Sequence, residues 1–157
     1  MQTNMAVYLV QHGKCLAASE DPEKGLSGEG KMEAQRIADV AAGYRVPVSR
    51  ILHSGKKRAR ETAEILSHAL SPKDGVAPAG GMKPLDDVRG FADHLRLDQD
   101  IMLVGHLPFL ERLAGLLITG NPDRTVFKLQ NSGILCIDRV ADVDHPVIRW
   151  ALMPSIG

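Results

Sequence analysis

The feature that most constrains this chain is a short apolar stretch near its N-terminus that ends abruptly in a histidine and a glycine. The stretch runs from Met5 and stops at Gln11-His12-Gly13. Its β-forming residues are typical of a buried strand. Because open α/β sheets bind ligands at the carboxyl ends of their strands, His12 is placed for chemistry, and Gly13, without a Cβ, lets a ligand approach. A histidine that only caps the strand by hydrogen bonding is the alternative.

Length and composition limit the class of protein. At 157 residues the chain suits one domain, and we expect residues 1–157 to form it. The 19 basic and 19 acidic residues balance to a net charge of +0, which predicts neither a nucleic-acid nor a membrane partner. The first four residues lack the basic start of a signal peptide, and no apolar run approaches the ~18 residues of a membrane span. We therefore expect a cytoplasmic protein.

Only two cysteines occur, Cys15 and Cys136. A chain of this length needs no disulfide, and so few cysteines agree with a reducing compartment. Each cysteine lies near the end of a predicted strand, so whether they interact is left open.

Strand and helix patterns alternate along the first two thirds of the chain, which predicts an α/β fold with parallel strands. Amphipathic spacing and capping residues predict four helices: residues 27–43, 57–70, 86–95 and 108–120. Apolar or alternating runs predict strands at 5–11, 51–54, 76–78 (a short edge strand), 100–105, 125–130, 133–140 and 147–153, the last three joined as hairpins.

Polar residues follow three of these strands. They are Gln11-His12-Gly13, Ser54 with Arg58, and Gly105-His106. Arg58 lies in the first turn of its helix, where free backbone N–H groups and the helix dipole favour an anion and a guanidinium can clamp it. Two histidines and an arginine at one edge of a sheet predict an anion site. The alternative is a solvated basic face, made of Lys56, Lys57, Arg58 and Arg60.

The same segments resemble the motifs of the histidine phosphatase superfamily, also called phosphoglycerate-mutase-like. Val10-Gln-His12-Gly13 resembles its first histidine motif, and Arg58-Ala-Arg-Glu-Thr62-Ala its second motif. Val104-Gly-His106 resembles its second histidine, and Leu26-Ser-x-x-Gly30 the helix start between the first two motifs. The likeness covers Val7 to about Cys136. The short chain and Gly105-His106-Leu-Pro108 are most similar to SixA-type phosphohistidine phosphatases.

This resemblance implies a three-layer α/β/α sandwich with a mostly parallel sheet, no metal, no cofactor and a phosphohistidine enzyme intermediate. It implies that His12 is the nucleophile and that Arg58 and His106 bind the equatorial oxygens of the phosphoryl group. Further residues are implied at the substrate. They are Gln11, Gly13, Ser54 and, in the loop after the first strand, Asp21 and Lys24.

Two departures from the family pattern stand out. Gln11 occupies the position of an arginine, so a neutral amide replaces a charged bidentate phosphate donor. No acid is clearly marked to protonate a leaving alkoxide, because Asp86 and Asp87 suit a proton donor and a helix N-cap equally well. A phosphorus–nitrogen bond needs less help to break than an ester.

We therefore predict a phosphatase that hydrolyses phosphohistidine through His12. Its partner would be a phosphorylated protein, such as a histidine-phosphotransfer domain, or a small phosphorylated substrate. The alternative is a non-catalytic phosphate-binding module, in which Gln11 in place of the family arginine reflects the loss of catalysis. A metal site from His12, His53 and His106 is a third reading, but no carboxylate or thiolate lies at ligand spacing from them.

Overall fold

The structure is a computed structural model that describes residues 6–156. The start of the predicted first strand at Met5 and the expectation about the first four residues fall outside this range. Within it, no helix is both long and apolar enough to cross a bilayer.

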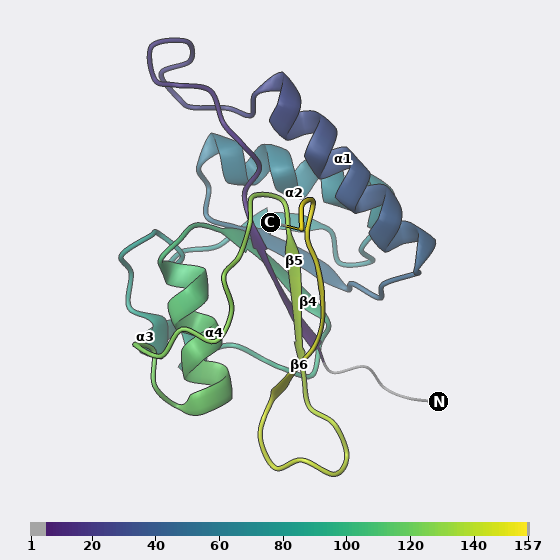
Figure 1. Cartoon of the computed structure of the whole chain (residues 1–157), viewed down its shortest axis with the longest axis vertical. Helices are drawn as coiled ribbons and strands as arrows, with labels where there is room; N and C mark the ends of the chain where they lie inside the picture. The colour runs from purple at the N-terminus through teal and green to yellow at the C-terminus, as the bar shows by residue number, and fades with distance from the viewer. Residues whose placement is uncertain (1–5, 157) are drawn as a thin grey trace.

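Ten elements build the fold (Figure 1). The strands form one sheet in the order β3-β2-β4-β1-β5-β6. β3, β2, β4 and β1 pair in parallel, whereas β5 pairs antiparallel with both β1 and β6. The elements are β1 (Ala6–Gln11), α1 (Gly28–Gly43), β2 (Arg50–His53), α2 (Lys57–Leu70), β3 (Val76–Pro78), α3 (Val88–Asp93), β4 (Ile101–Gly105), α4 (Phe109–Thr119), β5 (Ile134–Asp138) and β6 (Val147–Leu152).

The sheet lies between two helical layers. Figure 1 shows α1 and α2 together on one side of the strands and α3 and α4 on the other. Alternate residues of β1 serve the two cores, because successive strand side chains point to opposite faces. Tyr8 and Val10 pack in the cluster that includes α1 and α2, and Val7 and Leu9 in the cluster that includes α4. The predicted α/β/α fold with a mostly parallel sheet is confirmed.

Local signals set the ends of α1 as predicted. The side chain of Ser27 caps the helix by accepting a hydrogen bond from Gly30 N at 3.0 Å. Ser27 N also donates to Lys14 O at 3.0 Å, which ties the helix start to the segment after β1. A Cβ at Gly30 would lie 2.0 Å from Lys14 O, so glycine is needed for this close approach.

Strand register brings three carboxyl ends to one edge of the sheet. β4 lies between β1 and β2, with Gly105 opposite Gln11 and Val104 opposite His53. The residues that follow these three strands therefore emerge side by side. The parallel arrangement also places the start of α2 next to this edge, since α2 begins four residues after β2 ends.

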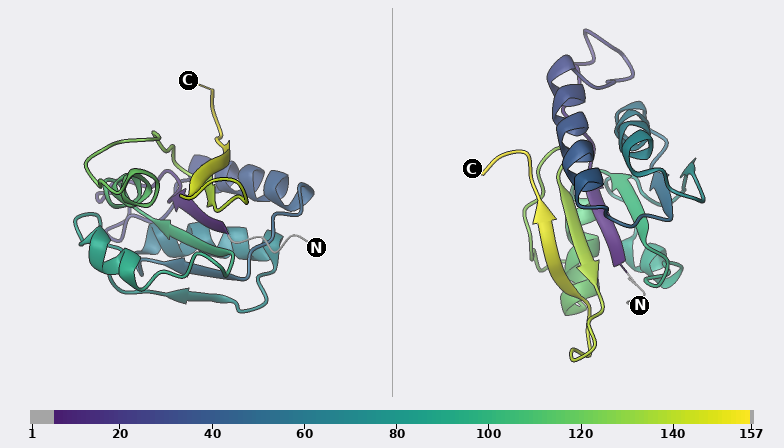
Figure 2. Two further views of the ribbon diagram at one scale, coloured as in Figure 1. Left: turned by 90° about the horizontal axis from the view of Figure 1, so that it is seen from below. Right: turned by 90° about the vertical axis from the view of Figure 1, so that its right-hand side faces the viewer.

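One predicted strand is wrong. Residues 125–130 form no strand; they belong to the irregular connection between α4 and β5. Both sides of β5 are already paired, and the backbone N–H of Leu129 donates instead to the Glu111 carboxylate on α4 at 3.1 Å. The late sheet thus has two strands, which form a hairpin at the edge opposite β3 (Figure 2).

Candidate active site

His12 directly follows β1, and two hydrogen bonds fix the backbone around it. Its N–H donates to Gly105 O at 3.0 Å, and its carbonyl accepts from Asn131 Nδ2 at 2.8 Å. The ring Nδ1 lies 2.7 Å from Gly13 O. Because a carbonyl can only accept, Nδ1 carries the proton in this contact, and the Nε2 lone pair is left free in the neutral ring.

His106 follows β4 and faces His12 across the edge of the sheet. The two ring centroids are 5.1 Å apart and the rings are tilted by 54°. The Nε2 atom of His106 lies 2.6 Å from Ser54 Oγ, just past the end of β2. Its Nδ1 atom is buried and has no hydrogen-bond partner among residues 6–156. Three strand ends therefore contribute to one cluster, as predicted.

Helix α2 joins this cluster through Thr62 and Arg58. Gly13 N donates to Thr62 Oγ1 at 2.9 Å, and this hydroxyl donates in turn to Arg58 O at 2.8 Å. The fully buried Thr62 thus fastens the glycine after His12 to the first turn of α2. In addition to burial, which is the largest cause, the positive charge of Arg58, in the first turn of α2, lowers the pKa of both His12 and His106.

The electrostatic environment favours the neutral form of both histidines. Burial lowers the pKa of His12, and the charge of Arg58 lowers it further, against the opposing effect of the Gly13 carbonyl. Burial also lowers the pKa of His106 to about 3, with contributions from His12, Arg58 and Lys56. A neutral imidazole can act as a nucleophile, and an anion placed between these groups would be attracted to the nearby cations.

Gln11 ends β1, and its amide oxygen Oε1 is buried without a hydrogen-bond partner among the described residues. Its backbone carbonyl accepts from Ser132 N at 2.8 Å. This bond belongs to the connection before β5, which returns to the edge of the sheet beside His12. Ser132 Oγ is itself buried and unpartnered in the described chain, and it would lie 3.0 Å from a Cβ at Gly13.

Asn131 and Ser132 were missed at the level of sequence. They contact the backbone around His12 although they lie about 120 positions further along the chain. No motif or periodicity marks them, because their role depends on the path of an irregular segment.

The loop after β1 is braced at its base. Asp21 pairs with Lys57 Nζ at 2.8 Å and accepts hydrogen bonds from Glu23 N and Gly25 N. The bond with Lys57 is the main cause that lowers the pKa of Asp21 to about 2. Lys24 is exposed and has a positive φ of 52°. Asp21 thus holds the loop against α2; the substrate contacts expected of Asp21 and Lys24 remain predictions.

The two candidate acids before α3 have structural partners. Asp87 caps α3 by accepting from Arg89 N at 3.0 Å and Gly90 N at 3.2 Å. Asp86 accepts from Lys83 N at 2.8 Å. The N-cap interpretation of this pair therefore has direct support. Cys15 and Cys136 are both free thiols, the first exposed and the second buried.

The structure is thus an α/β fold in which two facing histidines follow strands at the carboxyl edge of a mostly parallel sheet. Comparison with known proteins finds a family with similar sequence. The model of the histidine phosphatase superfamily (branch 1) matches residues 7–78, which include His12, Ser54 and Arg58. Over these residues the chain resembles the histidine phosphatase superfamily, as its motifs predict. No curated protein matches the sequence.

Solved structures extend the likeness over nearly the whole chain. The protein histidine phosphatase SixA in complex with tungstate has a TM-score of 0.81 at 22% identity, covering 95% of this chain and 97% of SixA. A protein described as phosphohistidine phosphatase SixA from Agrobacterium tumefaciens has a TM-score of 0.76 at 26% identity, covering 96% and 98%.

Other phosphatases share the fold. A phosphoserine phosphatase from Entamoeba histolytica, bound to 3-phosphoglyceric acid, has a TM-score of 0.68 at 17% identity, covering 94% of this chain and 96% of that protein. The predicted resemblance to the histidine phosphatase superfamily and to SixA is confirmed. The comparisons support a phosphatase; because the neighbours act on different compounds, they leave the substrate unspecified.

Proposed function

We propose that this protein is a phosphatase that hydrolyses phosphohistidine in a protein substrate through a phosphohistidine intermediate on His12. The observation that carries the proposal is the His12 ring, held by the contact of Nδ1 with Gly13 O at 2.7 Å and facing His106 with 5.1 Å between the ring centroids. A fixed tautomer is what a nucleophilic imidazole requires, because the attacking nitrogen must carry a lone pair.

Charge on the transferring phosphoryl group would be balanced from two sides. The first turn of α2 supplies the Arg58 guanidinium and unpaired backbone N–H groups, with no acidic residue in that turn to compete. His106, supported by Ser54, lies on the other side. These donors are set in place by strand ends and a helix start, so little reorganisation is needed when charge develops.

The reaction would take place in two displacements. In the first, His12 Nε2 attacks phosphorus and a new phosphorus–nitrogen bond forms. The bond to the substrate imidazole breaks and its electron pair goes to that ring, which already carries a proton on its other nitrogen and so leaves as neutral imidazole. In the second, water attacks phosphorus and the electron pair returns to His12 Nε2. Inorganic phosphate leaves, and the proton of the water passes to solvent.

The acidic side chains around the edge favour a nitrogen leaving group. Asp21 has a pKa of about 2, so it is ionised at neutral pH and cannot donate a proton to an alkoxide. Asp86 and Asp87 are occupied as acceptors of backbone hydrogen bonds. A substrate imidazole that is protonated on its other ring nitrogen leaves as a neutral group and needs no such donor, whereas an alkoxide does.

Phosphate release distinguishes this proposal from other phosphatase substrates. The protein is incubated with a histidine-phosphorylated phosphotransfer domain and, separately, with a phosphoserine peptide at the same concentration. We expect release from the phosphohistidine protein and much slower release from the ester. Release from the ester alone would overturn the substrate class while leaving a phosphatase.

The second candidate function, a phosphate-binding module without catalysis, is favoured by one observation. Gln11 stands where the family has arginine, and its buried Oε1 has no partner within residues 6–156. An amide gives weaker bonds to a phosphoryl oxygen than a guanidinium. If wild type binds phosphate but releases none from either substrate, the module is the correct function.

Gln11→Arg tests how strongly the side chain at position 11 contributes to phosphate binding. A charged donor contributes about 1.5–3 kcal/mol per hydrogen bond, so vanadate should bind about tenfold or more tightly to the variant in calorimetry. Gln11→Glu, of nearly the same shape but opposite charge, should bind vanadate more weakly than wild type. Equal vanadate affinity in all three proteins would mean that the side chain at position 11 does not face the phosphate.

A further inference from the structure

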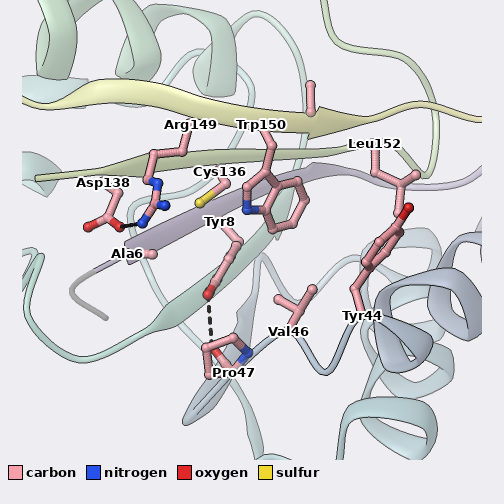
Figure 3. A pocket seen from close by; sticks show the side chains of 11 residues that line it. Ala6, Tyr8, Tyr44, Val46, Pro47, Cys136, Asp138, Arg149, Trp150 and Leu152 are labelled. Carbon is pink, nitrogen blue, oxygen red and sulfur yellow. Dashed lines mark hydrogen bonds and ion pairs between the residues drawn. The ribbon is translucent and has the colours of Figure 1, made fainter. Parts of the chain in front are cut away.

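The two ends of β5 have different surroundings. Its C-terminal end, together with β6 and the segment after α1, lines a cavity of about 620 Å³ (Figure 3). On the wall of this cavity Asp138 pairs with Arg149 at 3.2 Å. The start of β5 lies instead beside the histidine cluster, because Ile134 pairs with Val10, two residues before His12. The segment just before β5 is therefore next to the proposed nucleophile.

Residues 131 and 132 of this segment hold the end of β1. Ser132 N donates to Gln11 O at 2.8 Å, and Asn131 Nδ2 donates to His12 O at 2.8 Å. Because a carbonyl oxygen can only accept, the amide nitrogen of Asn131 is the atom that faces it. Ser132 is buried and has a positive φ of 65°, which is uncommon for a residue with a side chain. Such a conformation persists only where the surrounding contacts determine it, and it is frequent at functional sites.

The peptide unit between His12 and Gly13 is held at both of its polar atoms. Its oxygen accepts from Asn131, and its N–H donates to Thr62 Oγ1 at 2.9 Å. Because a peptide unit is planar, one bond from the segment before β5 and one from α2 fix the orientation of the whole unit. The next carbonyl along the chain, Gly13 O, lies 2.7 Å from His12 Nδ1. The contact between this carbonyl and the ring therefore depends on the fixed unit.

Gly13 itself cannot provide this restraint. A Cβ at this position would lie 3.0 Å from Ser132 Oγ and 3.1 Å from Leu26 Cδ2, so there is little room for a side chain. Glycine has the largest backbone freedom of all residues, and other contacts must restrict it. If the peptide unit between His12 and Gly13 turned, Gly13 O would move away from Nδ1, and the ring could take the other tautomer, with its proton on Nε2.

We propose that Asn131 is a positioning residue that keeps the proton of His12 on Nδ1 and the lone pair on Nε2. It acts through the peptide unit between His12 and Gly13, without contacting the substrate. This role rests on the proposed function, in which Nε2 is the attacking nitrogen. Loss of the Asn131 N–H donor should therefore lower the rate of phosphoryl transfer and leave substrate binding unchanged.

Asn131→Asp keeps the shape of the side chain and replaces the donor with a carboxylate, which repels the His12 carbonyl. Gln130→Glu is the matched control. The Gln130 amide also donates to a backbone carbonyl, Ser155 O at 3.0 Å, but this bond is exposed and involves neither His12 nor Gly13. The chain has six histidines, so the nitrogen-15 NMR signals of the His12 ring are assigned by their loss in His12→Ala. At mildly alkaline pH these signals report which ring nitrogen carries the proton.

We expect the proton on Nδ1 in wild type and in Gln130→Glu, and a mixture of both tautomers in Asn131→Asp. A hydrogen bond of this kind changes an equilibrium by up to about tenfold. The kcat for a phosphohistidine protein should therefore fall by up to about tenfold in Asn131→Asp, with KM within about twofold of wild type. Asn131→Ala removes the donor without adding a charge and should show the same mixture, so it replaces Asn131→Asp if that variant does not fold.

Four results would overturn the role of Asn131. They are a proton on Nε2 of His12 in wild type, a wild-type tautomer in both Asn131 variants, an equal change in Gln130→Glu, and a changed tautomer with unchanged kcat. The wild-type spectrum can overturn the role even if neither variant folds. Absence of turnover in all of these proteins would instead contradict the proposed function, and the ring signals would still decide whether Asn131 sets the tautomer.

Discussion

The two halves of the sheet build sites in different ways. In the parallel half, β1, β2 and β4 run in the same direction, so the residues after their carboxyl ends meet at one edge and the start of α2 arrives beside them. In the antiparallel half, β5 and β6 run in opposite directions and their ends do not converge. The cavity there is built instead from side chains that share one face of the strands.

This difference determines what each half can hold. An edge site offers backbone N–H groups, a helix dipole and polar residues from several loops, which suits a small, highly charged group such as phosphate. A face site offers rings and aliphatic side chains with few polar atoms, which suits an apolar ligand. If phosphate is bound and hydrolysed at the carboxyl edge of the parallel strands, substitutions there should lower activity and substitutions elsewhere should not.

His12→Ala should have the largest effect. Removal of the attacking nitrogen should lower kcat for a phosphohistidine protein by on the order of a thousandfold or more, because the covalent route is lost. His68→Ala, at an exposed position of α2, is the control and should leave kcat unchanged. Comparable loss in both variants, or none in His12→Ala, would remove the edge site from the reaction.

Arg58→Ala should have the next largest effect. Loss of a charged donor worth about 1.5–3 kcal/mol should lower kcat/KM about 10- to 100-fold and weaken vanadate binding in parallel. Arg60 lies two residues further along the same helix, is half exposed and pairs with Glu64 at 3.7 Å. Arg60→Ala should leave both quantities close to wild type; equal losses would favour a general basic face over a specific clamp.

Thr62→Val should lower both stability and rate. The valine leaves the buried Gly13 N–H without its acceptor, which costs about 1–3 kcal/mol in the free energy of unfolding measured with denaturant. It also loosens the position of His12, so kcat should fall. Thr62→Ser keeps the hydroxyl and should keep kcat; a serine variant as slow as the valine variant would show that packing of the methyl group is what matters.

The smallest expected change is in the free energy of unfolding as the pH is lowered. Burial lowers the pKa values of His12, His53 and His106 below the ordinary value of 6.5. Between the folded and unfolded pKa values the unfolded chain binds more protons, so the free energy of unfolding falls as the pH decreases below about 6.5. For His106 this decline continues to about pH 3.

His106→Gln removes one of these groups and should flatten the decline, measured by denaturant unfolding between pH 7 and pH 4. A slope equal to that of wild type would mean that folding does not lower the pKa of His106.

The edge site could be predicted from the sequence because each of its main residues follows directly on a recognisable element. His12 directly follows one buried apolar run and His106 follows another. The periodicity of α2 places Arg58 in its first turn. Local signals such as the Ser27 cap also fixed the start of α1. The sequence therefore predicted correctly those residues whose place is set by their position within or next to one helix or strand.

Long-range contacts could not be predicted in this way. Residues 125–130 alternate like a strand, yet a side chain on α4 satisfies the backbone at Leu129, and the segment continues to Asn131 beside His12. Likewise, Asp138 on β5 pairs with Arg149 on β6 at 3.2 Å, and the strand pattern alone gives no sign of this contact. Both features arise from segments that meet only in the folded chain.

The most direct test of the central claim is to identify the residue that carries phosphate during turnover. The protein is mixed rapidly with a histidine-phosphorylated substrate protein, denatured at alkaline pH to preserve phosphorus–nitrogen bonds, digested and analysed by mass spectrometry. We expect a phosphoryl group on His12 in wild type and none in His12→Ala. Phosphate on another residue, or steady turnover with no enzyme-bound phosphate at any time, would contradict the assignment of His12 as the nucleophile.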